Sequence, residues 1–164
     1  MLFRAFYSVV SLLGSSLAFF LVALYFFFVS LKISVELIFV FIISSIIIFV
    51  LRIFFRGERK HVKSFERKLL KKGLSKSKAA AFLARIEARS FASSHVARIS
   101  GFGTVLFFNG FATEFLMLVF VFALLVGLAR VKLRRHNALD VFTGFIVGVV
   151  SGYFAVGLYE AFFL

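Results

Sequence analysis

Residues 129–140 hold three side chains that together could bind a phosphate group and attack it. The sequence Ala-Arg-Val-Lys-Leu-Arg-Arg-His-Asn-Ala-Leu-Asp places His136 four residues before Asp140, the only aspartate of the chain. Two residues at this spacing share one face of a helical turn. Arg130 lies at the end of the preceding apolar run. A cation, an imidazole and a carboxylate are therefore expected to meet where two membrane helices join.

The composition indicates that these residues belong to an integral membrane protein. Of the 164 residues, 62% are hydrophobic, and the mean hydropathy is +1.07. Soluble domains are about half apolar, and runs of about 20 apolar residues are typical of membrane-spanning helices. Cysteine is absent. This excludes disulfides, thiolate catalysis and cysteine-based metal sites.

The hydropathy pattern predicts an all-α fold, a polytopic bundle of about five spans that forms a single membrane-embedded domain over residues 1–164. The expected spans are residues 5–31, 34–55, 94–110, 112–129 and 139–162. Lys32 and Glu36 should bracket a turn between the first two spans, and Asn109-Gly110 should form a tight turn between the third and fourth.

Glycine recurs every fourth residue in the last expected span, at Gly144, Gly148 and Gly152. Small residues at this spacing let another helix approach closely. We therefore expect this face of the span to pack against a neighbouring helix, as a structural rather than a chemical feature.

The segment 56–92 is a basic loop between the second and third spans, with twelve Lys or Arg and three Glu. A net charge of +13 would suggest nucleic acid in a soluble protein. Here basic loops beside apolar helices follow the positive-inside pattern, so no nucleic-acid partner is expected. Apolar residues at helical spacing favour amphipathic helices on the membrane surface over a plain solvated loop. The loop should therefore be partly helical.

The same charge pattern predicts the orientation in the membrane. With the basic loop inside, the N-terminus lies inside and the C-terminus outside, and of the 20 basic residues only Lys32 falls on the outer side. This arrangement gathers at the cytoplasmic face six side chains that could bind or react with phosphate: Arg52, Arg59, His95, Arg130, His136 and Asp140.

A second polar group opens the third expected span. Ser93 or Ser94 can cap this helix, whose free N–H groups favour an anion, and His95 follows. Taken alone, this group is explained by a capped helix with a histidine at the interface. Its combination with residues 130–140 favours a phosphate site.

These two stretches resemble the signatures of one known family, the type 2 phosphatidate phosphatases. Residues 130–140 resemble the third signature, S-R-x5-H-x3-D, with Ala129 in the place of serine. Residues 92–95, Ala-Ser-Ser-His, resemble the second signature, P-S-G-H, with two substitutions. The interval between them, about 34 residues with two spans, suits the family, which includes lipid phosphate phosphatases, prenyl-diphosphate phosphatases and vanadium haloperoxidases.

The first signature of the family, K-x6-R-P, is matched only loosely. Arg52 and Arg59 stand at the expected place, at the end of a span, with arginine for lysine and Lys60 for proline. Lys78 and Arg85 keep the lysine and arginine but lie in the loop. The first pair is preferred because phosphate ligands must project from the membrane face, and the second pair remains an alternative.

The resemblance implies a role for each residue. His136 would attack phosphorus to give a phosphohistidine, and Asp140 would hold its other ring nitrogen. His95 would protonate the leaving oxygen and then activate water. Arginine side chains would bind the phosphate oxygens, so that neither a metal nor a cofactor is needed. The phosphate-binding residues would be Arg130, Arg52, Arg59, Ser93 and Ser94.

The function predicted first is an integral membrane phosphatase that hydrolyses a lipid phosphate or an isoprenoid (polyprenyl) diphosphate. An alternative is a catalytically degenerate membrane protein that only binds anionic lipid headgroups. A channel or transporter would require ionisable residues deep within spans, and Glu36 and Glu114 are interpreted as interfacial. The specific lipid and the oligomeric state are left open by the sequence.

Overall fold

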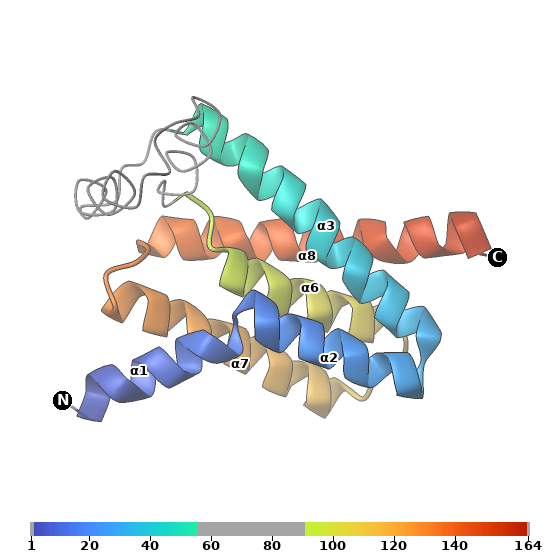
Figure 1. Ribbon diagram of the computed structural model, residues 1–164, viewed down its shortest axis with the longest axis horizontal. Coiled ribbons are helices and arrows are strands. Elements are labelled where there is room, and N and C mark those ends of the chain that lie inside the picture. Colours follow the sequence, from blue (N-terminus) through green and yellow to red (C-terminus); the bar gives the residue numbers. More distant parts are fainter. Residues whose placement is uncertain (1, 56–90, 164) are drawn as a thin grey trace, which may run out of the picture.

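The computed structural model describes residues 2–55 and 91–163, and all regular structure in these two ranges is helical (Figure 1). This confirms the predicted all-α fold. The helices are α1 (Leu2–Leu13), α2 (Ser16–Val29), α3 (Leu31–Phe54), α6 (Ser94–Phe108), α7 (Thr113–Lys132) and α8 (Ala138–Phe163). The expected basic surface helices fall at residues 56–90, outside the described residues.

Helices α1 and α2 run in roughly the same direction, and from α2 onward successive helices alternate in direction along the bundle (Figure 1). As a result, the end of α3, the starts of α6 and α8 and the end of α7 lie at one end of the bundle, together with the N-terminus. These are the helix ends that carry the residues singled out in the sequence.

The first expected span, residues 5–31, is not one helix. It breaks at Gly14 into α1 and α2, whose axes differ by 44°. Ser15 begins the second helix, because its Oγ accepts a hydrogen bond from the N–H of Ala18 at 3.3 Å. Glycine followed by a capping serine is a local signal for such a break, which the hydropathy of a continuous apolar run does not show.

The prediction of a turn between Lys32 and Glu36 is also wrong. The chain turns at Ser30 alone, whose Oγ caps α3 by accepting a hydrogen bond from the N–H of Ile33 at 3.5 Å. Both charged residues lie inside α3. The predicted turn at Asn109-Gly110 is present, and Gly110 adopts a positive φ of 74° there.

Glu36 is buried within the protein, with none of its surface exposed. The Nδ2 atom of Asn109 donates a hydrogen bond to its Oε2 at 2.6 Å, and the Lys32 Nζ lies 3.8 Å from its Oε1. Glu114, in the first turn of α7, is exposed. The Glu36 cluster joins the start of α3 to the end of α6, at the end of the bundle opposite the candidate site (Figure 1).

Fewer than the five predicted helices are long enough to span a membrane. Within the described ranges α3, α7 and α8 are long and apolar enough, and the bent pair α1–α2 could provide a fourth crossing. At 15 residues α6 is shorter than the about 20 that a bilayer requires. It instead forms the centre of the bundle, and most of its residues are buried. Large hydrophobic side chains cover much of the outer surface, as expected for a protein in lipid.

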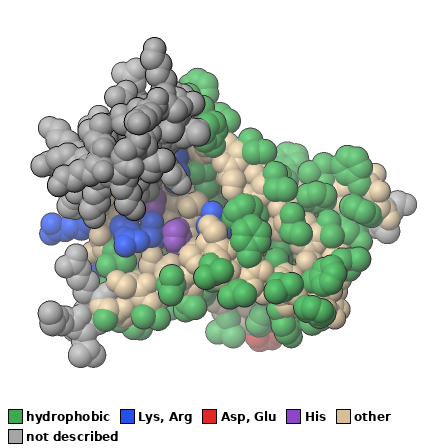
Figure 2. Space-filling model, in the orientation of Figure 1, with side chains coloured by type: hydrophobic (Ala, Val, Ile, Leu, Met, Phe, Trp, Pro, Cys, Tyr) green, Lys and Arg blue, Asp and Glu red, His purple; other side chains and the backbone are tan. Residues whose placement is uncertain are grey.

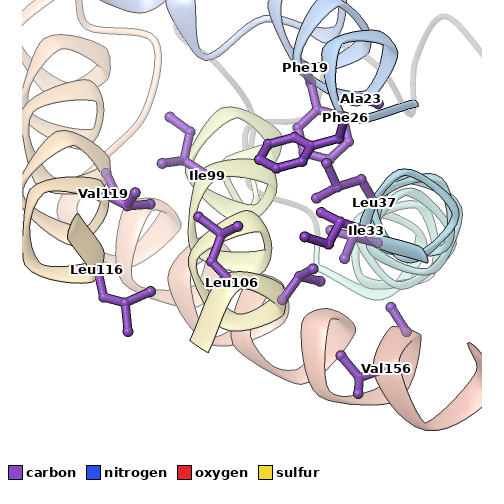
Figure 3. Close-up of a cluster of buried hydrophobic side chains, with 14 of the residues drawn as sticks. Phe19, Ala23, Phe26, Ile33, Leu37, Ile99, Leu106, Leu116, Val119 and Val156 are labelled. Atoms are coloured by element: carbon purple, nitrogen blue, oxygen red, sulfur yellow. The ribbon is translucent and has the colours of Figure 1, made fainter. Parts of the chain in front are cut away.

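The hydrophobic core surrounds α6. Side chains from α2, α3, α7 and α8 converge on it (Figure 3). Leu37 and Leu106 are fully buried there. The core therefore fixes α6, and with it the polar residues at the start of this helix.

The glycines at every fourth position of α8 pack against α6, as the sequence predicted. A Cβ atom at Gly148 would collide with the Ser100 side chain and the Ala97 carbonyl. A Cβ atom at Gly144 would lie 2.5 Å from the Ser93 carbonyl oxygen. Only glycine allows the two helices to approach this closely. This contact sets the distance between the two sequence stretches of the candidate site.

Candidate active site

The start of α8 positions Asp140 through a reciprocal cap with Asn137. The backbone N–H of Asn137 donates to Asp140 Oδ2 at 2.9 Å, and the backbone N–H of Asp140 donates to Asn137 Oδ1 at 2.7 Å. This arrangement is a capping box, in which each side chain satisfies a free backbone N–H of the other residue. Asp140 is only 2% exposed, so its carboxylate is held in one orientation.

His136 lies between this carboxylate and a guanidinium group. Its Nδ1 is 3.6 Å from Asp140 Oδ2, and its Nε2 is 3.2 Å from an Nη2 of Arg130. A guanidinium only donates hydrogen bonds, so Nε2 must act as the acceptor. The ring proton of the neutral imidazole is therefore on Nδ1, which faces Asp140. This tautomer leaves the lone pair on Nε2, the nitrogen that a nucleophilic histidine uses.

Helix α1 contributes Ser11 to this group. The Nη1 atom of Arg130 donates a hydrogen bond to the Ser11 Oγ at 2.9 Å, and both residues are buried. Two branches of one guanidinium are thus directed, one to the serine and the other to His136. The N-terminal helix is part of the site through this contact, although it is 119 residues away in sequence.

Residues 93–95 lie beside this group because α6 and α8 start at the same place. The backbone N–H of Ser93 donates to the backbone oxygen of Asp140 at 2.8 Å, and Gly144 packs on the Ser93 backbone. Ser93 is the N-cap residue of α6, but its Oγ makes no capping hydrogen bond and is buried without a hydrogen-bond partner among the described residues. Of the two serines predicted to cap the helix, Ser93 is at the N-cap position but its side chain does not cap, and its hydroxyl is left for another acceptor or donor. Ser94 is the first residue of the helix.

The backbone before Ser93 differs from what a proline would allow. Ala92 has a φ of 58° and is completely buried. Proline fixes φ near −65°, so it cannot occupy this position without a different turn. A left-handed alanine costs about 1–3 kcal/mol, and such strain is concentrated at functional sites. The alanine that stands at the proline position of the second signature thus adopts a backbone conformation that proline could not adopt.

His95, in the first turn of α6, faces the break between α1 and α2. A Cβ atom at Gly14 would lie 3.1 Å from the His95 Cβ and 2.9 Å from a methyl group of Val126. The break therefore packs directly beside this histidine. His95 and Arg130 are both contacted by the same N-terminal segment.

Arg52, in the last turn of α3, reaches the same end of the bundle. Its Nε donates a hydrogen bond to the backbone oxygen of Phe91 at 3.3 Å, immediately before the 92–95 stretch. Of the first-signature candidates, only this residue can be placed. Arg59 and the alternative pair Lys78 and Arg85 lie outside the described residues.

The electrostatics of the site favour an anion. Arg52 and Arg130 supply positive charge, and the starts of α6 and α8 direct free N–H groups and the positive ends of two helix dipoles to the same place. Figure 2 shows Lys, Arg and His side chains gathered toward one end of the visible face, while hydrophobic side chains cover most of the rest. Within residues 2–55 and 91–163 no group of three His, Cys, Asp or Glu could hold a metal ion.

Sequence reasoning missed two residues of this site. Asn137 carried a usable signal, because Asn followed three residues later by an acidic residue is a capping pattern before a helix. Ser11 carried none, since a serine within an apolar run gives no indication of a distant guanidinium.

We expect Ser11→Ala to lower kcat/KM by about 5-fold to 10-fold, because Arg130 would lose a hydrogen bond worth about 1 kcal/mol that fixes its orientation. Ser151→Ala is the matched control, since this equally buried hydroxyl bonds only within α8, to the carbonyl of Val147. Steady-state kinetics on both variants test the prediction. Equal effects from the two variants would show that Ser11 does not position the arginine.

Comparisons with known proteins agree on one family and one fold. A family model described as the PAP2 superfamily matches residues 33–163. The crystal structure of LpxE from Aquifex aeolicus superimposes with a TM-score of 0.72 at 21% sequence identity, over 95% of this chain and 86% of that one. No curated protein matches the sequence. The structural similarity covers more of the chain than the family match and reaches into α1 and α2, which precede the matched family region.

Proposed function

Because the chain belongs to the PAP2 superfamily, whose model matches most of its length, we propose that it is an integral membrane phosphatase that hydrolyses a lipid phosphate or a polyprenyl diphosphate. The observation that carries this proposal is the chain of contacts from Ser11 through Arg130 and His136 to Asp140. It provides a buried imidazole with a defined tautomer next to a guanidinium.

In the proposed first step, Nε2 of His136 attacks phosphorus. The guanidinium of Arg130 lies 3.2 Å from this nitrogen in the absence of substrate, so a phosphoryl group that bonds to the nitrogen would lie against a permanent positive charge. Asp140 stabilises the imidazolium that develops as the bond forms, because its carboxylate faces Nδ1. The leaving oxygen takes the bonding electron pair and is protonated by His95.

In the proposed second step, His95 removes a proton from water, which attacks the phosphohistidine. The products are inorganic phosphate and the regenerated imidazole of His136. Equatorial oxygens would be held by Arg130, Arg52 and Arg59, whose forked donors fit phosphate. The unpartnered hydroxyl of Ser93 and the N–H of Ser94, at the start of α6, complete the proposed phosphate-binding site.

The function is tested by phosphate release in detergent micelles. The substrates are phosphatidate, a phosphatidylglycerophosphate-type lipid and a polyprenyl diphosphate, each assayed with excess chelator. Release that persists in chelator and is lost in His136→Ala supports a metal-independent histidine phosphatase. Absence of release from every substrate, with the protein shown to be folded, would overturn the proposal in favour of a headgroup-binding protein that does not cleave.

We also propose that the active-site face is cytoplasmic, with the N-terminus on the same side, as the lysines of the 56–92 loop indicate. The chain lacks cysteine, so a single introduced cysteine reports on which side of the membrane its position lies, without background labelling. A cysteine at exposed Arg135 should react with an impermeant maleimide only after permeabilisation. A cysteine at Glu160, near the end of α8, should react in intact cells. The opposite labelling pattern would reverse the orientation.

A further inference from the structure

Arg98 is a buried cation that the proposed mechanism does not use. It lies in α6 three residues after His95, a spacing that places both on one side of the helix. Only 9% of its surface is exposed. Its guanidinium lies over the ring of Phe41, 4.8 Å from the ring centre, and its Nε has no hydrogen-bond partner among the described residues.

No carboxylate of the described residues forms an ion pair with Arg98. Asp140 is occupied by Asn137 and His136, and Glu36 is paired at the other end of the bundle. A buried charge that lacks a counter-ion is costly, and the contact with an aromatic ring replaces only part of its hydration. Arg98 is therefore suited to an anion that arrives with a ligand.

Arg98 also forms part of the wall of an apolar cleft beside the site. The cleft has a volume of about 230 Å³ and lies between the α1–α2 break, α6 and α7. Its rim includes Leu13 and Leu118, which are 52% and 66% exposed on the lipid-facing surface. Arg98 is the one charged residue of this lining.

The cleft borders His95, on the proposed leaving-group side of the reaction. Gly14 lines the cleft and packs on His95, the residue proposed to protonate the leaving oxygen. Along α6, His95 is followed one turn later by Arg98, which borders the apolar lining of the cleft. A leaving group with an anion near the cleaved bond and a hydrocarbon chain beyond it matches this order.

We propose that Arg98 binds a second phosphate on the leaving group, and that the cleft holds the lipid chain attached to it. The inference rests on the proposed function and specifies its substrate class: a lipid in which a phosphate lies between the hydrolysed phosphate and the chain. The bond from His136 Nε2 to the terminal phosphorus forms, and the bond from that phosphorus to the bridging oxygen breaks. The released lipid phosphate takes a proton from His95, and water then yields inorganic phosphate.

Two kinds of lipid satisfy this chemistry, and matched substrates distinguish them. In a polyprenyl diphosphate the second phosphate is directly bonded, and the control with the same chain is the polyprenyl monophosphate. In a phosphatidylglycerophosphate-type lipid a glycerol separates the two phosphates, and the control is phosphatidate. For each pair, the wild-type kcat/KM of the two-phosphate lipid is divided by that of its one-phosphate control. The pair with the larger ratio identifies the source of the second phosphate.

Arg98→Met keeps a long apolar side chain and removes the charge. We expect it to lower the ratio of kcat/KM between the two-phosphate lipid and its one-phosphate control by about 10-fold or more, since a charge-assisted hydrogen bond is lost. Arg98→Lys should restore part of the ratio. Lys132→Met, which removes an exposed cation outside the cleft, should leave the ratio unchanged. Equal losses on both members of a pair would overturn the inference and assign Arg98 a packing role.

A binding measurement keeps this inference separate from the proposed catalysis. The probe is a prenyl methylenediphosphonate, which cannot be cleaved, bound to His136→Ala protein with and without Arg98→Met. Weaker binding by about 10-fold in the double variant supports the subsite even if the wild type releases no phosphate. Equal binding by the two proteins overturns the subsite even if the wild type is an active phosphatase.

Discussion

His136→Ala is expected to abolish phosphate release from every lipid that the wild type cleaves, a loss of about 10,000-fold or more. The variant removes the Nε2 atom that would bond to phosphorus and breaks the chain of contacts from Arg130 to Asp140. His61→Ala is the matched control, because this histidine belongs to neither signature stretch. Activity that survives in His136→Ala and remains sensitive to His95→Ala would contradict the nucleophilic role.

The covalent intermediate allows a sharper measurement of the same prediction. An aryl phosphate has a leaving group that needs no protonation, so His95→Ala should still be phosphorylated by it but should lose the base for the second step. Rapid quenching with labelled substrate is then expected to trap an acid-labile label on His136 in His95→Ala. No label should be found when both histidines are replaced. A stoichiometric label on another residue would assign the nucleophile elsewhere.

Gly148→Ala is expected to destabilise the protein severely, although the change adds a single methyl group. In an isolated helix alanine would be favoured over glycine by about 1 kcal/mol. At this position the methyl group would collide with the carbonyl of Ala97, which belongs to the backbone of α6 and cannot move aside alone. We expect a net loss of about 2 kcal/mol or more in the free energy of unfolding, because the two helices must separate.

Thermal unfolding in detergent measures this effect, with Gly157→Ala as the control in the same helix. Nothing lies within 4 Å of a Cβ atom at Gly157, so this variant should be as stable as the wild type or slightly more stable. A Gly148→Ala midpoint equal to that of the control would mean that α6 and α8 are not closely packed in solution. The loss should also reduce activity, because the same contact aligns Ser93 with Asp140.

The two signature stretches show how far local sequence determines a site. The spacing of His136 and Asp140 placed their side chains together, because four residues make one helical turn, and the structure has Nδ1 and Oδ2 3.6 Å apart. The prediction that the glycines of α8 form a packing face is also confirmed, since small side chains at this spacing allow another helix to approach closely. The chemical assignments of these residues remain predictions until the variants are measured.

The errors concern features that local sequence describes poorly. Hydropathy showed residues 5–31 as one apolar run, and the break at Gly14 depends on its packing against His95 and Val126 from other helices. Helix α6 matches the expected span of residues 94–110 to within two residues, but its 15 residues are short for a membrane crossing, because a helix enclosed by protein need not match the bilayer. In each case neighbours distant in the sequence decided the outcome.

By itself, the sequence determined the all-helical membrane fold, the family and the residues that could react with phosphate, because these depend on composition and on spacing within single helices. Only the tertiary structure decided which distant residues join them. Ser11 reaches Arg130 across 119 positions, and Arg98 lies in a cleft that exists only where three helical segments meet. Such contacts depend on how apolar surfaces from distant segments pack together, and this packing cannot be predicted from the residue pattern within one segment.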